Sequence, residues 1–235
     1  LISLVYCNKI RLDTKNLYTL FTSSNGVSID TRNLINGQIY FSLKGENFNG
    51  NNFAIEALDK GASYSVIDDK SILNKNPNLI YVDDSLKSLQ ELSSYHRSQY
   101  DTKIIGVTGS NGKTTTKNLI HSILSQKYNV LKTKGNLNNH IGVPLSLFDI
   151  NEEVDIAIIE MGANHIGEIK SLCQIAMPDL GLITNYGKAH LEGFGGFKGV
   201  VEGKTEMFDY LTQNYGHIIL NNDCLLYTSD AADDR

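Results

Sequence analysis

The stretch Gly109-Ser110-Asn111-Gly112-Lys113-Thr114-Thr115 decides how this chain folds. It joins an apolar run at residues 104–108, which is predicted to be a buried strand, to a helical pattern at residues 114–126. Glycines let the backbone turn sharply at such a junction, and the free N–H groups that begin a helix bind phosphate oxygens. The sequence therefore predicts a phosphate-binding loop between a strand and a helix.

The residue types in this loop suit a nucleotide triphosphate. Lys113 would neutralise the outer phosphates, and the Thr114 hydroxyl would be a ligand for Mg²⁺. The strict P-loop pattern is not met, because Val107 stands where that pattern has its first glycine. An ordinary strand-to-helix turn is the alternative interpretation, and the strand before the loop and the helix after it favour the phosphate site.

Strands and helices alternate regularly from residue 103 onward. Such alternation is typical of a parallel sheet that is covered on both faces and binds ligands at the carboxyl ends of its strands. The predicted fold class is α/β, with a P-loop-type parallel-sheet domain at residues 101–224. We expect strands at residues 104–108, 129–132, 154–159, 180–184 and 217–220, and helices at residues 114–126, 141–148, 166–177 and 200–211.

The first part of the chain is predicted to be a separate, smaller α/β domain at residues 1–100, because 235 residues exceed the usual length of one domain. Residues 225–235 form a polar, acidic tail without periodicity and are interpreted as non-native. Within the first domain we expect strands at residues 39–41, 64–67 and 79–82, a helix at 53–60, and a helix at 85–100 that Ser85 caps.

Composition excludes several classes of protein. The chain is 41% hydrophobic, and its formal net charge of −5 gives no basic excess for binding nucleic acid. Cys7, Cys173 and Cys224 lie too far apart for a disulfide framework or a metal knuckle, which favours a reducing compartment. Residues 1–6 are apolar but too short to span a bilayer and lack the features of a signal peptide. We therefore expect a cytoplasmic, monomeric protein without membrane insertion.

Two further residues follow predicted strands. Glu160 ends the run at residues 154–159, where a carboxylate could hold Mg²⁺ or could simply cap a helix. His190 follows the strand at residues 180–184. A lone histidine is more often a hydrogen-bonded surface or core residue, but its predicted position at the same sheet edge as Gly109 and Glu160 favours a functional role.

Two other features stay open on spacing alone. Lys204 would ordinarily be a solvated helix lysine. The loop at residues 135–144 is rich in amides, including Asn136, Asn138 and Asn139, and could either clamp a polar ligand or form Asx-turns.

Four separated motifs, taken together, resemble the Mur ligase family. They are Thr108–Thr116 around the loop, Gly135-Asn136-Leu137-Asn138-Asn139, Glu160-Met161-Gly162-Ala163-Asn164, and Ala189-His190-Leu191-Glu192-Gly193-Phe194-Gly195. The shortened loop of that family accounts for Val107. The resemblance covers residues 16–223 and stops before the rest of the central domain and the whole C-terminal domain of the family.

The resemblance implies that the first domain binds a UDP-linked substrate. Its motifs there are Asp30-Thr31-Arg32, in which Thr31 stands where the family often has serine, and the segment at residues 41–50 that contains Lys44 and Gly45. It also implies that Asn136, Asn138 and Asn139 hold that substrate. Lys204 matches a family lysine that becomes carbamylated and then binds Mg²⁺ beside His190.

The implied activity is an ATP- and Mg²⁺-dependent amide ligase of peptidoglycan precursor synthesis. In that reaction UDP-N-acetylmuramoyl-tripeptide is activated as an acyl phosphate, and the amine of D-alanyl-D-alanine attacks it. Lys113, Glu160, His190 and Lys204 would be the catalytic residues, with Thr114 and Glu160 on one ion and His190 and Lys204 on another. The alternatives are a sister ligase that adds the third stem residue and a P-loop nucleotide-binding protein without ligase activity. Residues 1–235 alone are expected to be inactive.

Overall fold

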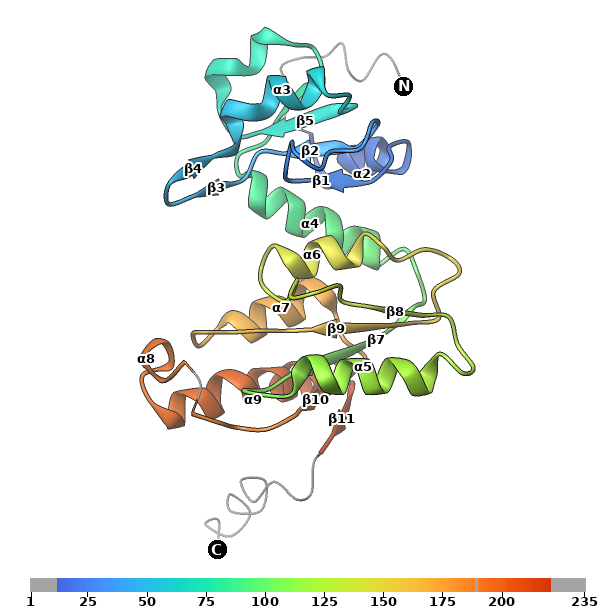
Figure 1. Ribbon diagram of the computed structural model, residues 1–235, viewed down its shortest axis with the longest axis vertical. Helices are drawn as coiled ribbons and strands as arrows, with labels where there is room; N and C mark the ends of the chain where they lie inside the picture. Colours follow the sequence, from blue (N-terminus) through green and yellow to red (C-terminus); the bar gives the residue numbers. More distant parts are fainter. Residues whose placement is uncertain (1–11, 189, 221–235) are drawn as a thin grey trace, which may run out of the picture. The chain divides into compact units, whose positions relative to one another are not determined.

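The computed structural model describes residues 12–188 and 190–220 and divides into two compact units between His96 and Arg97. Each unit is built around its own parallel sheet with helices packed against it (Figure 1). The α/β class predicted from the sequence is confirmed. None of the helices within residues 12–188 and 190–220 has the length and apolar content needed to cross a membrane.

The first unit contains a four-stranded sheet in the order β1-β2-β5-β6, with every pair parallel. Its central strand β2 buries all three side chains, since helices and loops cover both faces. The elements are α2 (Thr14–Thr22), β1 (Val27–Ser28), β2 (Ile39–Phe41), the hairpin β3 (Lys44–Gly45) and β4 (Phe48–Asn49), η1 (Gly50–Phe53), α3 (Ala54–Asp59), β5 (Tyr64–Ile67), η2 (Lys70–Lys75), β6 (Leu79–Tyr81) and α4 (Ser85–Arg97).

The structure adds one helix to those predicted for this unit and corrects the cap of another. Helix α2 was not predicted, although Asp13 caps it by accepting a hydrogen bond from the Asn16 N–H. Helix α4 is capped by Asp84, whose Oδ1 accepts from the Lys87 N–H at 2.9 Å. Ser85 is instead a buried residue of the first turn. A carboxylate one position earlier therefore takes the capping role expected of the serine.

The second unit contains a five-stranded parallel sheet in the order β11-β10-β7-β9-β8. Val107 of β7 pairs with both Glu160 of β9 and Leu182 of β10, so three neighbouring strands end at the same edge. The elements are β7 (Lys103–Thr108), α5 (Lys113–Leu124), β8 (Val130–Lys132), α6 (Gly142–Leu147), β9 (Ile156–Glu160), α7 (Glu168–Ala176), β10 (Leu180–Ile183), α8 (Leu191–Phe194), α9 (Phe197–Gln213) and β11 (His217–Ile219).

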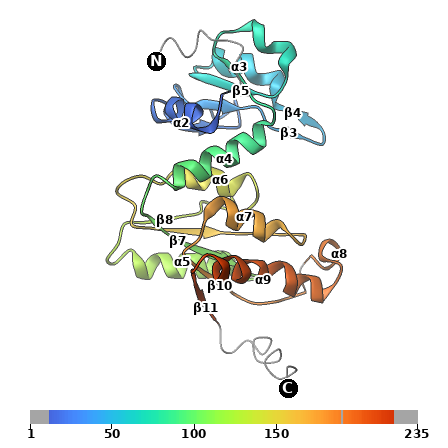
Figure 2. The same ribbon diagram turned by 180° about the vertical axis from the view of Figure 1, so that it is seen from behind.

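Alternation along the strands assigns the helices to the two faces of this sheet. Ile104 and Ile159 belong to the core that also contains apolar residues of α6, α7 and α9. Ile105 and Ile158 face the opposite way and pack with Ile120 and Leu124 of α5. Helices α7 and α9 lie side by side in both views (Figure 2). The sheet is thus a fixed platform whose carboxyl edge carries the loops of the candidate site.

Asp179 ties the opposite, amino edge of the sheet together. Its Oδ2 accepts hydrogen bonds from the Ile104 N–H at 2.8 Å and from Arg97 at 3.2 Å. Its Oδ1 accepts from Lys103 Nζ at 3.1 Å. Asp179 thus accepts the hydrogen bond of the backbone N–H of Ile104. Because Arg97 is largely buried, Asp179 also supplies the negative charge that balances its guanidinium.

Candidate nucleotide-binding site

The loop between β7 and α5 requires glycine at two positions. Gly109 has φ +143°, and a Cβ added there would collide with Thr184 Oγ1 at the end of β10. Gly112 has φ +77° and precedes the first residue of α5. Only glycine adopts these angles without strain, and only glycine permits the close approach of the loop to β10. The predicted strand–loop–helix junction is therefore present.

Hydrogen bonds hold this loop against the segment that follows β10. The Ser110 N–H donates to the Asn185 backbone oxygen at 3.1 Å, and the Asn111 N–H donates to Asn185 Oδ1 at 3.0 Å. Ser110 Oγ accepts from the Gly187 N–H at 2.8 Å. The loop is preorganised by a neighbouring strand end, which sequence spacing did not indicate.

The start of α5 offers a place for an anion. The N–H groups of residues 112–115 precede the first intrahelical bond, which runs from Thr116 to Gly112, so they have no partner within the helix. Lys113 Nζ donates to the Gly109 carbonyl at 2.7 Å. Burial lowers the pKa of Lys113, and the charge on Glu160 opposes that shift. A phosphate group would supply this half-buried ammonium with a counter-charge.

Glu160 lies at the carboxyl end of β9 beside this loop and is 2% exposed. Its Oε2 accepts from Thr114 Oγ1 at 3.0 Å, and its Oε1 accepts from Asn138 Nδ2 at 2.9 Å. Burial raises the pKa of Glu160, but the hydrogen bonds from Asn138 and Lys117 and the charge of Lys117 outweigh it and hold the pKa below its usual range. Glu160 is therefore an ionised carboxylate beside the Thr114 hydroxyl. It is not a helix cap, which was the alternative interpretation.

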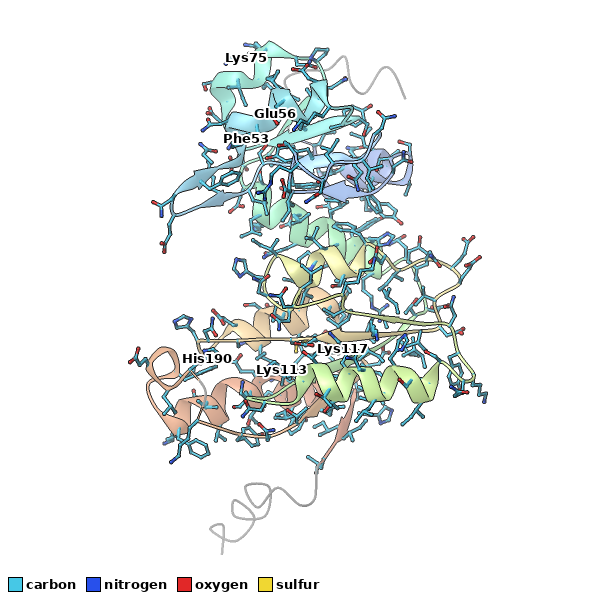
Figure 3. The ribbon with its side chains drawn as sticks, in the orientation of Figure 1. Phe53, Glu56, Lys75, Lys113, Lys117 and His190 are labelled. Atoms are coloured by element: carbon cyan, nitrogen blue, oxygen red, sulfur yellow. The ribbon has the colours of Figure 1, made fainter. Side chains whose placement is uncertain are left out.

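Lys117 is a residue of this cluster that the sequence analysis missed. Its Nζ lies 2.9 Å from Glu160 Oε2, and both side chains are 2% exposed. Figure 3 shows Lys113 and Lys117 one turn apart on α5. Lys117 follows Lys113 by four residues, which puts both on one face of the helix. This spacing was the feature of the sequence that could have indicated Lys117 as a site residue. A polar residue on the buried face of a helix usually has a buried partner.

The amide-rich loop at residues 135–144 could, from the sequence, either clamp a ligand or form Asx-turns, and its asparagines take different roles in the structure. Asn139 Oδ1 accepts from the Ile141 and Gly142 N–H groups, which is an Asx-turn at the start of α6. Asn138 instead contacts the Glu160 carboxylate, and its backbone oxygen accepts from Gly162 at 2.7 Å. The Asn136 side chain is exposed. The loop is thus fixed from within by one amide and joined to Glu160 by another.

Lys204 is buried, so the interpretation as a solvated helix lysine is wrong. Its side chain is 2% exposed, and Nζ lies 5.4 Å from the centre of the Phe194 ring. Within residues 12–188 and 190–220, no hydrogen bond or ion pair reaches Nζ. Burial, with a smaller contribution from the charge of Lys113, lowers the pKa of Lys204 to about 8. The amine is therefore far more often neutral than that of a surface lysine.

His190 lies in the loop after β10, immediately before α8, with φ +56°. Its side chain is exposed, and its backbone oxygen accepts from the Phe194 N–H. Figure 3 places it beyond the carboxyl ends of the strands, on the same side of the sheet as Lys113. In the described residues no contact joins the imidazole to Lys204 or Glu160. The structure thus brings Thr114 and Glu160 together and leaves His190 at the same edge but apart.

The candidate residues of the first unit form two separate groups. In the first, Arg32 makes a two-point ion pair with Asp30, with contacts of 2.7 to 3.1 Å. The hydrogen bond from Arg32 is the main cause that lowers the pKa of Asp30 to about 2. Thr31 donates to Glu56 Oε1 at 3.2 Å, and Glu56 pairs with Lys60, the residue that follows the last turn of α3. The Arg32 guanidinium remains largely exposed and available to a ligand.

The second group is built on the β3–β4 hairpin. Lys44 Nζ lies 2.9 Å from Asp68 Oδ1, and Asn51 Nδ2 donates to the same oxygen at 2.7 Å. Gly45 pairs with Phe48 across the hairpin, and Phe48 stacks on Phe53 with ring centres 5.4 Å apart. Figure 3 labels Phe53 and Glu56 on the same side of this unit. Asp68 and Asn51 were not predicted as site residues, because no motif spacing marks them in the sequence.

The donors around Glu160 suit a hard cation. Within the part of the chain that the structure describes, no group of three or more His, Cys, Asp or Glu side chains is placed to hold a metal ion by itself. A hydroxyl and a carboxylate that share one point are instead the oxygen pair that magnesium takes when phosphates complete its shell. The cluster therefore fits a magnesium ion that arrives with a polyphosphate.

Comparisons with known proteins agree with this geometry. The model of the Mur ligase middle domain matches residues 107–233. The UDP-N-acetylmuramoyl-tripeptide–D-alanyl-D-alanine ligase of Bacillus subtilis is 42% identical over 207 residues, which are 87% of this chain and 45% of that protein. The Escherichia coli ligase of the same name is 41% identical, over 85% of this chain and 43% of that protein.

Solved structures give the same result. The crystal structure of MurF ligase from Thermotoga maritima in complex with ADP has a TM-score of 0.79 and 33% identity, covering 89% of this chain and 48% of that chain. The chain thus spans about half the length of the relatives it matches.

Proposed function

The chain belongs to the Mur ligase family, and on that premise we propose that it is the substrate- and ATP-binding part of a ligase that joins D-alanyl-D-alanine to UDP-N-acetylmuramoyl-tripeptide. Relatives that carry this name are 33% to 42% identical to it over most of its length. The enzyme would act in peptidoglycan precursor synthesis. The central unit would bind MgATP, and the first unit would bind the UDP portion of the substrate.

The observation that carries this proposal is the meeting of Thr114 Oγ1 and Glu160 Oε2 at 3.0 Å, where β7, β9 and the start of α5 come together. A hydroxyl from the phosphate loop and a carboxylate from the next strand are the pair that holds magnesium in P-loop enzymes. When bound there, the ion would neutralise charge that develops on the phosphate oxygens. The fixed positions of both side chains mean that little reorganisation is needed.

The proposed reaction proceeds in two steps. A carboxylate oxygen of the tripeptide attacks the γ-phosphorus of ATP, and the bond to the β–γ bridging oxygen breaks to release ADP. The amine of D-alanyl-D-alanine then attacks the acyl carbon, loses a proton, and expels inorganic phosphate. Lys113 would leave the Gly109 carbonyl to contact the transferred phosphoryl group, because a half-buried ammonium gains most from a charged partner.

Lys204 and His190 are proposed to form a second metal position nearer the acyl group. The lowered pKa of Lys204 supports this assignment, since only a neutral amine reacts with carbon dioxide to give a carbamate. Carbamylation would turn an unpaired buried cation into an anionic oxygen ligand. His190 lies in the loop before α8, and that helix packs on α9, which carries Lys204.

The first unit is proposed to recognise the UDP portion through the exposed Arg32 guanidinium, Asp30, Thr31 and the Lys44–Gly45 hairpin. Arg32 and Lys44 supply positive charge suited to a diphosphate. Asn136, Asn138 and Asn139 would contact the substrate from the central unit. The remainder of the relatives' length would supply the acceptor-binding domain, so residues 1–235 alone are expected not to form the amide bond.

The test is substrate-dependent ATP turnover by the complete protein that contains this chain. We expect phosphate release only when UDP-N-acetylmuramoyl-tripeptide and D-alanyl-D-alanine are both present, and loss of turnover in Glu160→Gln. Turnover with the UDP-linked dipeptide and a diamino acid would instead identify the sister ligase that adds the third residue. Turnover that ignores every one of these substrates would leave only a P-loop nucleotide hydrolase.

A further inference from the structure

The ion pair between Lys117 and Glu160 has no part in the reaction proposed above. Its atoms lie 2.9 Å apart, and both side chains are 2% exposed. Lys117 Nζ also donates to the Gly135 carbonyl at 3.3 Å, so the ammonium is held on two sides. Taking two charges out of water is costly and seldom gains net stability. A pair placed at the nucleotide site therefore invites a functional explanation.

Lys117 contacts the same carboxylate oxygen as Thr114. That oxygen, Glu160 Oε2, is the atom proposed as a magnesium ligand. A divalent cation is drawn to a carboxylate by its negative charge, and an ammonium in direct contact cancels most of that attraction. Lys113, which begins the same helix, adds a second positive charge nearby (Figure 3). The fixed charges of the cluster therefore sum to a positive value until phosphate arrives.

We propose that Lys117 makes magnesium binding at Glu160 conditional on nucleotide. By neutralising the carboxylate, Lys117 prevents a divalent ion from binding at the site without nucleotide. The phosphates of ATP then supply the negative charge that makes binding of the ion favourable. The inference rests on the proposed function, because it takes Glu160 as the ligand of the ATP-bound ion. A lysine that only supported the fold would have the opposite effect on removal, since a misplaced carboxylate binds metal more weakly.

The test uses Mn²⁺ as a probe and measures free Mn²⁺ by electron paramagnetic resonance, on the complete protein, with and without a non-hydrolysable ATP analogue. In the wild-type protein we expect weak Mn²⁺ binding alone and much tighter binding with the analogue. In Lys117→Met, Mn²⁺ alone should bind about tenfold more tightly or better, and the gain from nucleotide should shrink. Lys117→Arg keeps the charge and should behave as wild type.

The matched control is Lys132→Met, which removes a lysine that bonds Asn118 at the surface and should change neither affinity. If the Met variant does not fold, as judged by circular dichroism, Lys117→Gln tests the same point because it keeps a hydrogen-bond donor without the charge. Unchanged or weaker Mn²⁺ binding in a folded neutral variant overturns the inference and leaves the proposed function standing. If the wild-type protein binds neither the ATP analogue nor Mn²⁺ in the presence of the analogue, both the inference and the proposed function are overturned.

Discussion

Replacing Lys204 by methionine should remove a pH dependence of stability that the wild-type chain carries. Burial lowers the pKa of Lys204 from 10.5 to about 8 in the folded protein. Between those values the lysine is protonated in the unfolded chain and neutral in the folded chain, so unfolding takes up a proton. The free energy of unfolding therefore rises with pH across this window, and the contribution of the lysine is least favourable below about pH 8.

The size of the effect follows from the shift. Each unit of pKa difference corresponds to about 1.4 kcal/mol of unfolding free energy. Because pH 10 still lies below the unfolded pKa of 10.5, only part of the full shift is realised between about pH 7 and about pH 10. Over that range the free energy of unfolding of the wild-type protein should rise by about 2.5 kcal/mol relative to that of Lys204→Met. Urea titrations followed by circular dichroism, in buffer freed of carbon dioxide to keep the amine unmodified, would measure this difference.

Lys198→Met is the matched control, because Lys198 is an exposed lysine on the same helix α9. Its stability relative to wild type should not depend on pH in the same way. A difference between wild type and Lys204→Met that stays constant from about pH 7 to about pH 10 would show that Lys204 is not held neutral by burial. The reasoning that links its position to carbamate formation would then lose its basis.

Three further substitutions, with Glu202→Ala as a control, test the framework of the site. Gly109→Ala should abolish binding of the ATP analogue, measured by calorimetry, and should lower the free energy of unfolding by about 1–3 kcal/mol, because the Cβ of the alanine would collide with Thr184 at the end of β10. Asp179→Ala should lower the free energy of unfolding by about 1–3 kcal/mol in urea titrations, since the buried Arg97 loses its counter-charge; no loss would refute that role. Glu206→Ala should cost about 1–2 kcal/mol, because Glu206 accepts hydrogen bonds from N–H groups at the start of α7. The exposed Glu202→Ala on the same helix should be nearly neutral, and equal losses would contradict the capping role.

The order of the strands in the central unit, and of its helices apart from α8, was predictable from the sequence, as was the position of the phosphate loop. These features are local: a strand such as β7 has a continuous apolar run, and the turn after it needs glycine where φ is positive. Short elements were missed, because the two residues of β1 or β3 carry too little pattern to predict a strand. Helix α2 was not predicted, and the clearest sequence signal for it is Asp13, which caps its N-terminus.

The burial of the charged side chains, and the partners they contact, depend on packing between elements and could not be predicted from local sequence. Lys204 has the spacing of an ordinary helix lysine, and Lys117 is marked only by its position one turn after Lys113, yet both are 2% exposed. Their burial depends on side chains of other elements, such as Glu160 of β9 for Lys117 and Phe194 of α8 for Lys204. A local pattern records the periodicity of a helix, whereas the charge environment of each lysine is set by side chains that approach it from other elements. The acid, the hydroxyl and the second lysine therefore meet as a consequence of the register of β7 against β9.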